Sequence, residues 1–138
     1  MINDDIAAIT TPLGEGGVAI IRTSGNQVIE KIAGIFKPYR KEANLKEKQS
    51  YTLSLGWIID EQQEIIDEVL VSIMKKPKSY TAEDVVEINC HGGILPAQRC
   101  LETVLATGIR LAEPGEFTRR AFLNGRLDIN QAEAVVDV

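Results

Sequence analysis

Two stretches of this 138-residue chain place a charged side chain where it could bind a ligand. Glu87 lies in the middle of the apolar run DVVEINCHGG, and Arg22 directly follows the run VAII. A carboxylate accepts hydrogen bonds from two adjacent N–H groups, such as those of an arginine, a guanine or the aminopyrimidinone ring of a pterin. An arginine pairs with a carboxylate or an anionic ligand. Either residue could instead lie on an ordinary solvent-exposed surface, so the residues alone leave both interpretations open.

A third charged group lies in GEFTRRAFLNGR, where Arg119, Arg120 and Arg126 are close in sequence. Three arginines could form an anion site, but Glu116 and Asp128 are near enough to neutralise them. Spacing alone favours a solvated helix end.

The remaining reactive residue types suggest neither catalysis nor metal binding. His91 is the only histidine, which excludes a site with several histidine ligands. Its neighbour Cys90 would point to the opposite face of a strand, so a catalytic Cys-His pair is not expected. Cys90 and Cys100 form no C-x-x-C motif, and we interpret them as small buried hydrophobic residues. We predict no catalytic residue and no metal site.

Composition indicates one soluble globular domain, with 44% hydrophobic and 25% charged residues. No apolar run reaches the roughly 20 residues that span a bilayer, and MINDDIAA does not resemble a signal peptide, so we expect a cytoplasmic protein without a membrane partner. The net charge of −5 disfavours nucleic acid as a partner unless a local basic patch exists. The phosphate-binding pattern G-x-x-x-x-G-K-[ST] is missing, so this chain alone should not hydrolyse GTP or ATP by that route.

Hydrophobic periodicity and turn residues predict the elements that must position these side chains. Strands are expected at residues 5–9, 17–25, 84–93 and 109–113, a hairpin at 51–74, and helices at 24–36, 94–108 and 114–125. Alternation places Glu87, Asn89 and His91 on one face of their strand. The order predicts an α+β domain with one mixed β-sheet and packed helices.

Three local features carry more specific expectations. Ser24 and Gln27 have the spacing of a capping box at the start of the first helix. The charged segment 37–50 lacks periodicity and is interpreted as a solvated connection without function. In the hairpin, a period of two predicts that Tyr51, Leu53, Leu55, Trp57 and Ile59 point the same way.

Three long motifs, taken together, resemble one family. TTPLGEGGVAIIRTSG, SYTAEDVVEINCHGG and EPGEFTRRAFLNGRLDINQAEAVVDV are similar to the amino-terminal region of the MnmE (TrmE) tRNA modification GTPases. The resemblance runs from about Asp5 to Val138 and is weak only through the charged connection and the hairpin. Leu13, Ala82, Glu113 and Arg126 depart from the family's usual residues, and none of these departures removes a presumed ligand contact.

The resemblance implies a multidomain protein. Residues 1–118 would form a folate-binding and dimerisation domain, similar in fold to half of the folate-binding region of aminomethyltransferases such as glycine-cleavage T-protein. Residues 119–138 would begin a helical domain that is cut short here, and the GTPase domain, with its GTP, magnesium and potassium, would lie outside this chain. The family acts as a homodimer with the flavin-dependent partner MnmG, and adds a carboxymethylaminomethyl-type group to the 5-position of wobble uridine in tRNA.

Carried over by motif, the family's folate-binding residues are Arg22 in VAIIRTSG, Glu87 in DVVEINCHGG and Arg126 in LNGRLD. The ligand would be 5-formyl- or 5,10-methylene-tetrahydrofolate, and Glu87 would bind the pterin amino group and ring N–H. The fragment alone is expected to bind folate without GTPase activity. Two alternatives are a structural dimerisation module without folate binding and a free-standing folate-dependent aminomethyltransferase.

Overall fold

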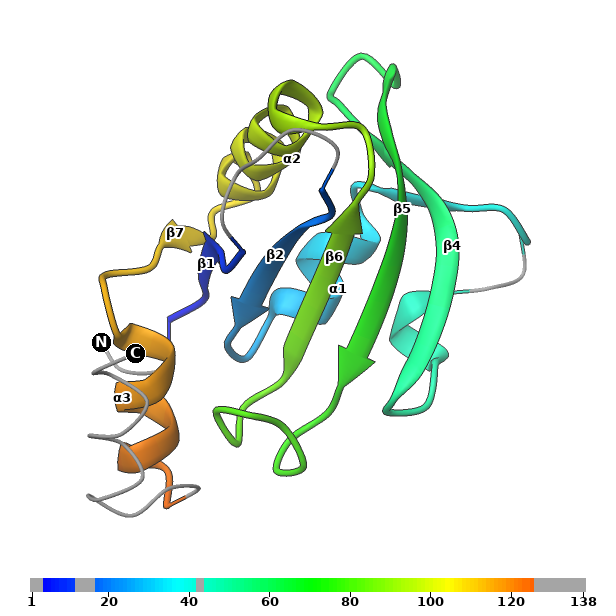
Figure 1. Cartoon of the computed structure of the whole chain (residues 1–138). Coiled ribbons are helices and arrows are strands. Elements are labelled where there is room, and N and C mark those ends of the chain that lie inside the picture. Colours follow the sequence, from blue (N-terminus) through cyan, green and yellow to red (C-terminus); the bar gives the residue numbers. More distant parts are fainter. Residues whose placement is uncertain (1–3, 12–16, 42–43, 126–138) are drawn as a thin grey trace.

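The computed structural model describes residues 4–11, 17–41 and 44–125, which form one seven-stranded mixed sheet with helices packed on it (Figure 1). The expected α+β class is therefore confirmed. The strands are β1 (Ile6–Ile9), β2 (Ala19–Ser24), β3 (Phe36–Pro38), β4 (Thr52–Ile59), β5 (Ile65–Met74), β6 (Val85–Cys90) and β7 (Arg110–Leu111). The helices are α1 (Val28–Ala33), the 3-10 helix η1 (Leu45–Glu47), α2 (Ile94–Ala106) and α3 (Glu116–Leu123). Among the helices of this described part, we find none with the length and apolar character needed to cross a bilayer.

The sheet order is β3-β4-β5-β6-β2-β1-β7. All neighbouring strands are antiparallel except β1 and β7, which are parallel. The two strands that carry Arg22 and Glu87, β2 and β6, lie side by side in the sheet, and their register places these residues directly opposite each other.

One face of the sheet forms the hydrophobic core. Val28 and Ile32 of α1, together with Ala97, Cys100 and Val104 of α2, pack against it. The strand residues in this core alternate along their strands, as a half-buried sheet requires: Ile21, Ile58, Val69, Val71, Ile73, Val86 and Ile88. Both α1 and α2 therefore cover the same side.

The opposite side, which we name the open face, carries the residues between those core positions. It comprises Leu53, Leu55, Trp57 and Ile59 of β4, Leu70 and Ser72 of β5, Glu87 and Asn89 of β6, and Arg22 of β2. The predicted common orientation is thus correct for Leu53, Leu55, Trp57 and Ile59, whereas Tyr51 precedes β4 and has a φ of +65°. The side that these β4 residues share is the one that α1 and α2 leave uncovered. On the core side of β4, Phe36 packs directly over Gly56. A Cβ at Gly56 would lie 2.7 Å from the Phe36 ring, so the absence of a side chain there lets Phe36 pack against β4.

The start of α1 differs from the prediction. Gln27 is the N-terminal flanking residue, and its backbone N–H donates to Asp5 Oδ1 at 3.0 Å. Ser24 Oγ instead donates to Glu83 Oε1 at 2.6 Å, so the expected capping box is wrong. The carboxylate of Asp5, which directly precedes β1, thus accepts a hydrogen bond at the start of the helix. Local spacing could not reveal this contact, because Asp5 is 22 residues from Gln27.

The segment after α1 is also more ordered than expected. The helix ends at Ala33 rather than continuing to Phe36, because Phe36–Pro38 pairs with Gly56–Ile58 as an edge strand. Within the predicted solvated connection, Leu45 is buried and anchors η1 to the core. Asn44 caps this short helix by accepting a hydrogen bond from the Lys46 N–H at 3.0 Å.

Candidate functional site

Arg22 and Glu87 form an ion pair at the centre of the open face. Arg22 Nε donates to Glu87 Oε2 at 2.8 Å, and the side chains are 27% and 22% exposed. The pair results from the antiparallel register of β2 and β6, which sets the two residues opposite each other. The structure therefore brings together two of the three predicted site residues.

Aromatic rings flank the Arg22 guanidinium. Its Cζ lies 5.1 Å from the centroid of the Tyr80 ring and 5.7 Å from that of Phe117, distances at which cation–π attraction operates. Tyr80 is held by a 2.8 Å hydrogen bond between its hydroxyl and Thr118 Oγ1. Residues from the loop before β6 and from α3 thus form a wall beside the ion pair.

The donor and acceptor set of this place suits a flat ring that carries adjacent N–H groups. Among the residues that the structure describes, Glu87 Oε1 and the Nη groups of Arg22 have no hydrogen-bond partner. Asn89, the next residue of β6 on the open face, donates to Leu70 O at 3.1 Å and is therefore already engaged. His91 is exposed, and its backbone N–H donates to Asp67 Oδ2 at 3.0 Å.

A second charged network holds α3 against the sheet beside this pair. Arg120 is 2% exposed and is the largest fully buried side chain. Its Nη1 lies 3.2 Å from Glu83 Oε1, while its Nη2 lies 2.6 Å from Asp4 Oδ1 and 3.1 Å from Glu116 Oε2. Arg110 also pairs with Asp4 at 2.8 Å and with Glu116 at 2.7 Å. The expected solvated helix end is wrong for Arg120, since carboxylates from distant segments allow this cation to be buried.

This network changes the acidity of its carboxylates. Hydrogen bonds from the Arg110 guanidinium lower the pKa of Glu116 to about 2 and hold that of Asp4 well below its usual range. Both groups are therefore anionic across the neutral range. Because carboxylates neutralise Arg110 and Arg120, the network serves to hold α3 in place and is not a preformed anion-binding site.

The other two arginines of the stretch GEFTRRAFLNGR are Arg119 and Arg126. Arg119 lies at the surface and pairs with Glu113 at 3.3 Å. Arg126, the third predicted folate contact, lies outside the described residues, as does its neighbour Asp128.

The two cysteines are buried and unbridged, as the sequence predicted. With Asp67 they place two sulfur atoms and a carboxylate oxygen within 4.8 Å of one another, a spacing that a metal ion could bridge. A hydrogen bond with Cys90, together with burial, raises the pKa of the Cys100 thiol far above its usual range. Metal ligation requires the thiolate, so this environment favours a neutral Cys100 thiol.

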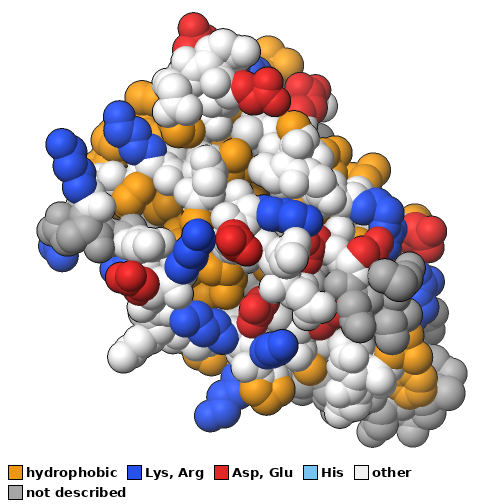
Figure 2. All heavy atoms as spheres, turned by 180° about the vertical axis from the view of Figure 1, so that it is seen from behind, with side chains coloured by type: hydrophobic (Ala, Val, Ile, Leu, Met, Phe, Trp, Pro, Cys, Tyr) orange, Lys and Arg blue, Asp and Glu red, His pale blue; other side chains and the backbone are white. Residues whose placement is uncertain are grey.

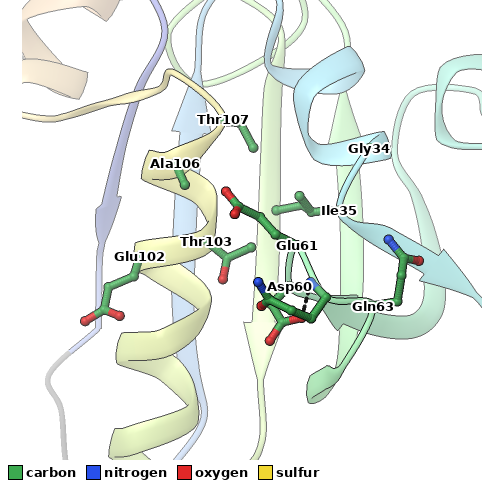
Figure 3. Close-up of a pocket in the computed structure, with 10 residues that line it drawn as sticks. Gly34, Ile35, Asp60, Glu61, Gln63, Glu102, Thr103, Ala106 and Thr107 are labelled. Carbon is green, nitrogen blue, oxygen red and sulfur yellow. Dashed lines mark hydrogen bonds between the residues drawn. The ribbon is translucent and has the colours of Figure 1, made fainter.

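Two grooves lie away from the ion pair. One of about 360 Å³ runs between the β4–β5 turn and the last turns of α2 (Figure 3). The carboxylates of Asp60, Glu61 and Glu102 line it, so it would repel an anionic ligand. The other, of about 410 Å³, is bounded by the Arg110 and Arg120 network. Neither contains Arg22 or Glu87 among its lining residues.

Sequence reasoning missed the residues that surround the predicted site. Tyr80 and Phe117 meet Arg22 only through the tertiary fold, and nothing in their local pattern marks them. The spacing of Glu116 and Arg120, four residues apart on one helix, is a signal for a pair on α3. Glu83 has no such signal, because its partners Ser24 and Arg120 are distant in the chain.

Comparison with known proteins gives consistent matches. Residues 5–126 match the family described as GTP-binding protein TrmE N-terminus. The chain is 69% identical over 138 residues to the tRNA modification GTPase MnmE of Syntrophomonas wolfei subsp. wolfei. It is 63% and 59% identical, over 139 residues each, to the proteins of that name from Moorella thermoacetica and Carboxydothermus hydrogenoformans. Each alignment covers all of this chain and 30% of the relative, so the chain spans about a third of their length.

Proposed function

This chain belongs to the family of the GTP-binding protein TrmE N-terminus, and from that premise we propose that it is the tetrahydrofolate-binding, homodimerising part of a tRNA modification GTPase. The whole protein would hydrolyse GTP in a domain beyond these residues, with magnesium and potassium. Together with MnmG it would add a carboxymethylaminomethyl-type group to wobble uridine of tRNA in the cytoplasm. The names of the relatives support the GTPase and tRNA parts of this proposal.

The ion pair on the open face is the observation that carries the folate proposal. Glu87 Oε1 is available to accept from the pterin amino group or ring N–H, while Oε2 stays bonded to Arg22. The rings of Tyr80 and Phe117 beside Arg22 provide apolar contact for a flat heterocycle. When bound, 5-formyl- or 5,10-methylene-tetrahydrofolate would supply the one-carbon unit. Arg126 is proposed as a third contact from the family resemblance.

The open face also supports the proposal of a homodimer. Leu53 and Leu55 of β4 are 65% and 40% exposed, and Trp57 follows them on the same side. A row of apolar side chains that the helices of the described chain leave uncovered is typical of an association surface. Tyr39 packs against Trp57 in this row, with ring centroids 4.1 Å apart. A second copy would bury it and would supply the duplicated arrangement proposed by likeness to aminomethyltransferases.

Titration with 5-formyltetrahydrofolate by isothermal calorimetry tests the pterin contact. Glu87→Gln keeps the side-chain shape but replaces a charge-assisted acceptor, so we expect binding to weaken by about tenfold or more. Glu102→Gln, an exposed glutamate on α2, is the matched control and should bind like the unaltered protein. Equal affinities for Glu87→Gln and the control would refute the contact.

A purely structural dimerisation module is the second candidate, since the apolar open face alone would suffice for it. Sedimentation would then show a dimer while calorimetry showed no folate heat. A free-standing aminomethyltransferase is separated from both by assay, because it would turn over tetrahydrofolate and an amine donor without GTP.

A further inference from the structure

The basic residues of this acidic protein are distributed unevenly. Segments 37–48 and 75–78 together hold eight of the fifteen lysines and arginines and only two glutamates. We name them the basic surface, and its cations are Lys37, Arg40, Lys41, Lys46, Lys48, Lys75, Lys76 and Lys78. Figure 2 shows Lys and Arg side chains along the left and lower parts of its view, with some Asp and Glu side chains between them and others at the top.

Segment 75–78 contacts the residues that directly follow segment 37–48, although the two are separated along the chain. The Lys75 backbone N–H donates to Ser50 Oγ at 2.8 Å, and the Tyr51 hydroxyl donates to the carbonyl of Lys78. Both contacts follow from the pairing of β4 with β5, in which Thr52 lies opposite Ile73. The cations therefore share one side of the molecule.

The basic surface differs from the rest of the described chain in that few of its cations form ion pairs. Every other described lysine or arginine lies within 4.0 Å of a carboxylate: Arg22, Lys31, Arg99, Arg110, Arg119 and Arg120. On the basic surface only Lys46 does so, at 3.9 Å from Glu30. The other seven have no such partner among the carboxylates of residues 4–11, 17–41 and 44–125. Unneutralised cations gathered on one side attract a polyanion despite the negative net charge.

A small pocket lies within this surface, at the edge of β4 that β3 leaves uncovered. It has a volume of about 240 Å³, and its lining residues are Tyr39, Arg40, Lys48, Leu53, Ser54 and Leu55. Ser54 is 7% exposed, and its hydroxyl has no hydrogen-bond partner in the described structure. A pocket lined by two cations and a buried hydroxyl fits a phosphate group, which accepts hydrogen bonds from all three.

We propose that the basic surface binds the phosphate backbone of a folded RNA, with one phosphate in the pocket lined by Arg40, Lys48 and Ser54. This rests on the proposed function, in which the RNA is the tRNA substrate, and it assigns the surface that holds it. Tyr51, which is 66% exposed beside the cations, adds a face on which an unpaired base stacks. Arg22 and Glu87 lie on β2 and β6, whereas the pocket lies at the edge of β4 and borders the open face at Leu53 and Leu55.

The test is the binding of fluorescently labelled unmodified tRNA to the purified protein, measured by anisotropy at several salt concentrations. Arg40→Gln/Lys48→Gln should weaken binding by about tenfold and lower the slope of log K against log salt by about two. Ser54→Ala should weaken binding by about three- to tenfold. The matched control, Arg99→Gln/Arg119→Gln, removes two similarly exposed cations elsewhere and should change neither quantity.

Each result has a defined consequence. Equal losses in the two double variants would refute the basic surface while leaving tRNA binding by the protein intact. Absence of tRNA binding by the unaltered protein would refute the surface alone, because the tRNA part of the proposed function belongs to the whole protein acting with MnmG, and folate titration remains a separate measurement. Binding of phosphatidylserine vesicles in place of tRNA, lost in Arg40→Gln/Lys48→Gln, would show a membrane partner and overturn the RNA proposal.

Discussion

Replacement of Arg120 by methionine tests whether the buried network holds α3 in place. The side chain is 2% exposed, and Arg120→Met keeps much of its volume while removing its charge and its hydrogen bonds. Arg110 would still neutralise Asp4 and Glu116, but Glu83 would keep only the hydroxyl of Ser24 as a partner among the contacts described. The variant therefore leaves one buried carboxylate, that of Glu83, without a cationic partner among the described contacts.

The expected loss is large because Glu83, 8% exposed, would be buried without a cation. Removing one partner of a buried ion pair costs about 3–5 kcal/mol of unfolding free energy. With a urea m-value of about 1–3 kcal/mol/M, the midpoint should fall by about 1 M or more. Arg119→Met is the control, since its pair with Glu113 is exposed and should contribute about 0–1 kcal/mol.

Urea unfolding followed by Trp57 fluorescence measures both variants. The reasoning is refuted if the midpoint of Arg120→Met falls no further than that of Arg119→Met. A third variant, Arg120→Met/Glu83→Gln, tests the assigned cause. It should recover part of the lost stability, because the stranded charge is gone.

Further predictions concern pH, a turn and the cysteines. Hydrogen bonds from Arg110 lower the pKa of Glu116 from 4.5 to about 2, so its contribution to stability is complete above pH 4.5 and is lost as the pH falls toward 2; an acid titration of the urea midpoint should show this loss, and it should be absent in Glu116→Gln. Gly25→Ala should destabilise the protein by more than about 1 kcal/mol in the same assay, because φ is +150° and a Cβ would lie 2.7 Å from Asp5 Cα; unchanged stability would contradict the described turn. Neither cysteine should react with a thiol reagent in the native state, while both should react in urea, because each is at most 1% exposed; rapid native labelling would show that the thiols are accessible.

Much of the fold was predictable from local pattern. Alternation placed Glu87 and the core residue Ile88 on opposite faces of β6, and the structure confirms it. The prediction that segment 37–50 is a plain solvated connection failed because β3 is short and Leu45 is an isolated apolar residue among charges. Neither has a periodicity long enough to detect, so their ordering depends on contacts with β4 and the core.

The candidate site was only half predictable for the same reason. Arg22 and Glu87 each stood out as a charge in an apolar strand, and the resemblance assigned both to folate. The rings of Tyr80 and Phe117, however, reach Arg22 from a loop and a helix. Contacts of this kind leave no mark in the sequence, because side-chain identity does not specify which distant backbone segment lies beside it.

The sequence by itself determined the α+β class, the family and most of the strands and helices, with β3 and η1 as exceptions. These follow from hydrophobic periodicity and from long motifs, both of which depend only on the order of residues in the sequence. Only the tertiary structure decided that Arg22 and Glu87, 65 residues apart, pair with each other, that Arg120 is buried, and that one side of the sheet stays open. Each of these depends on strand order and register, which bring distant charges within a few ångströms and so decide whether a charge meets solvent, a ligand or a partner in the same chain.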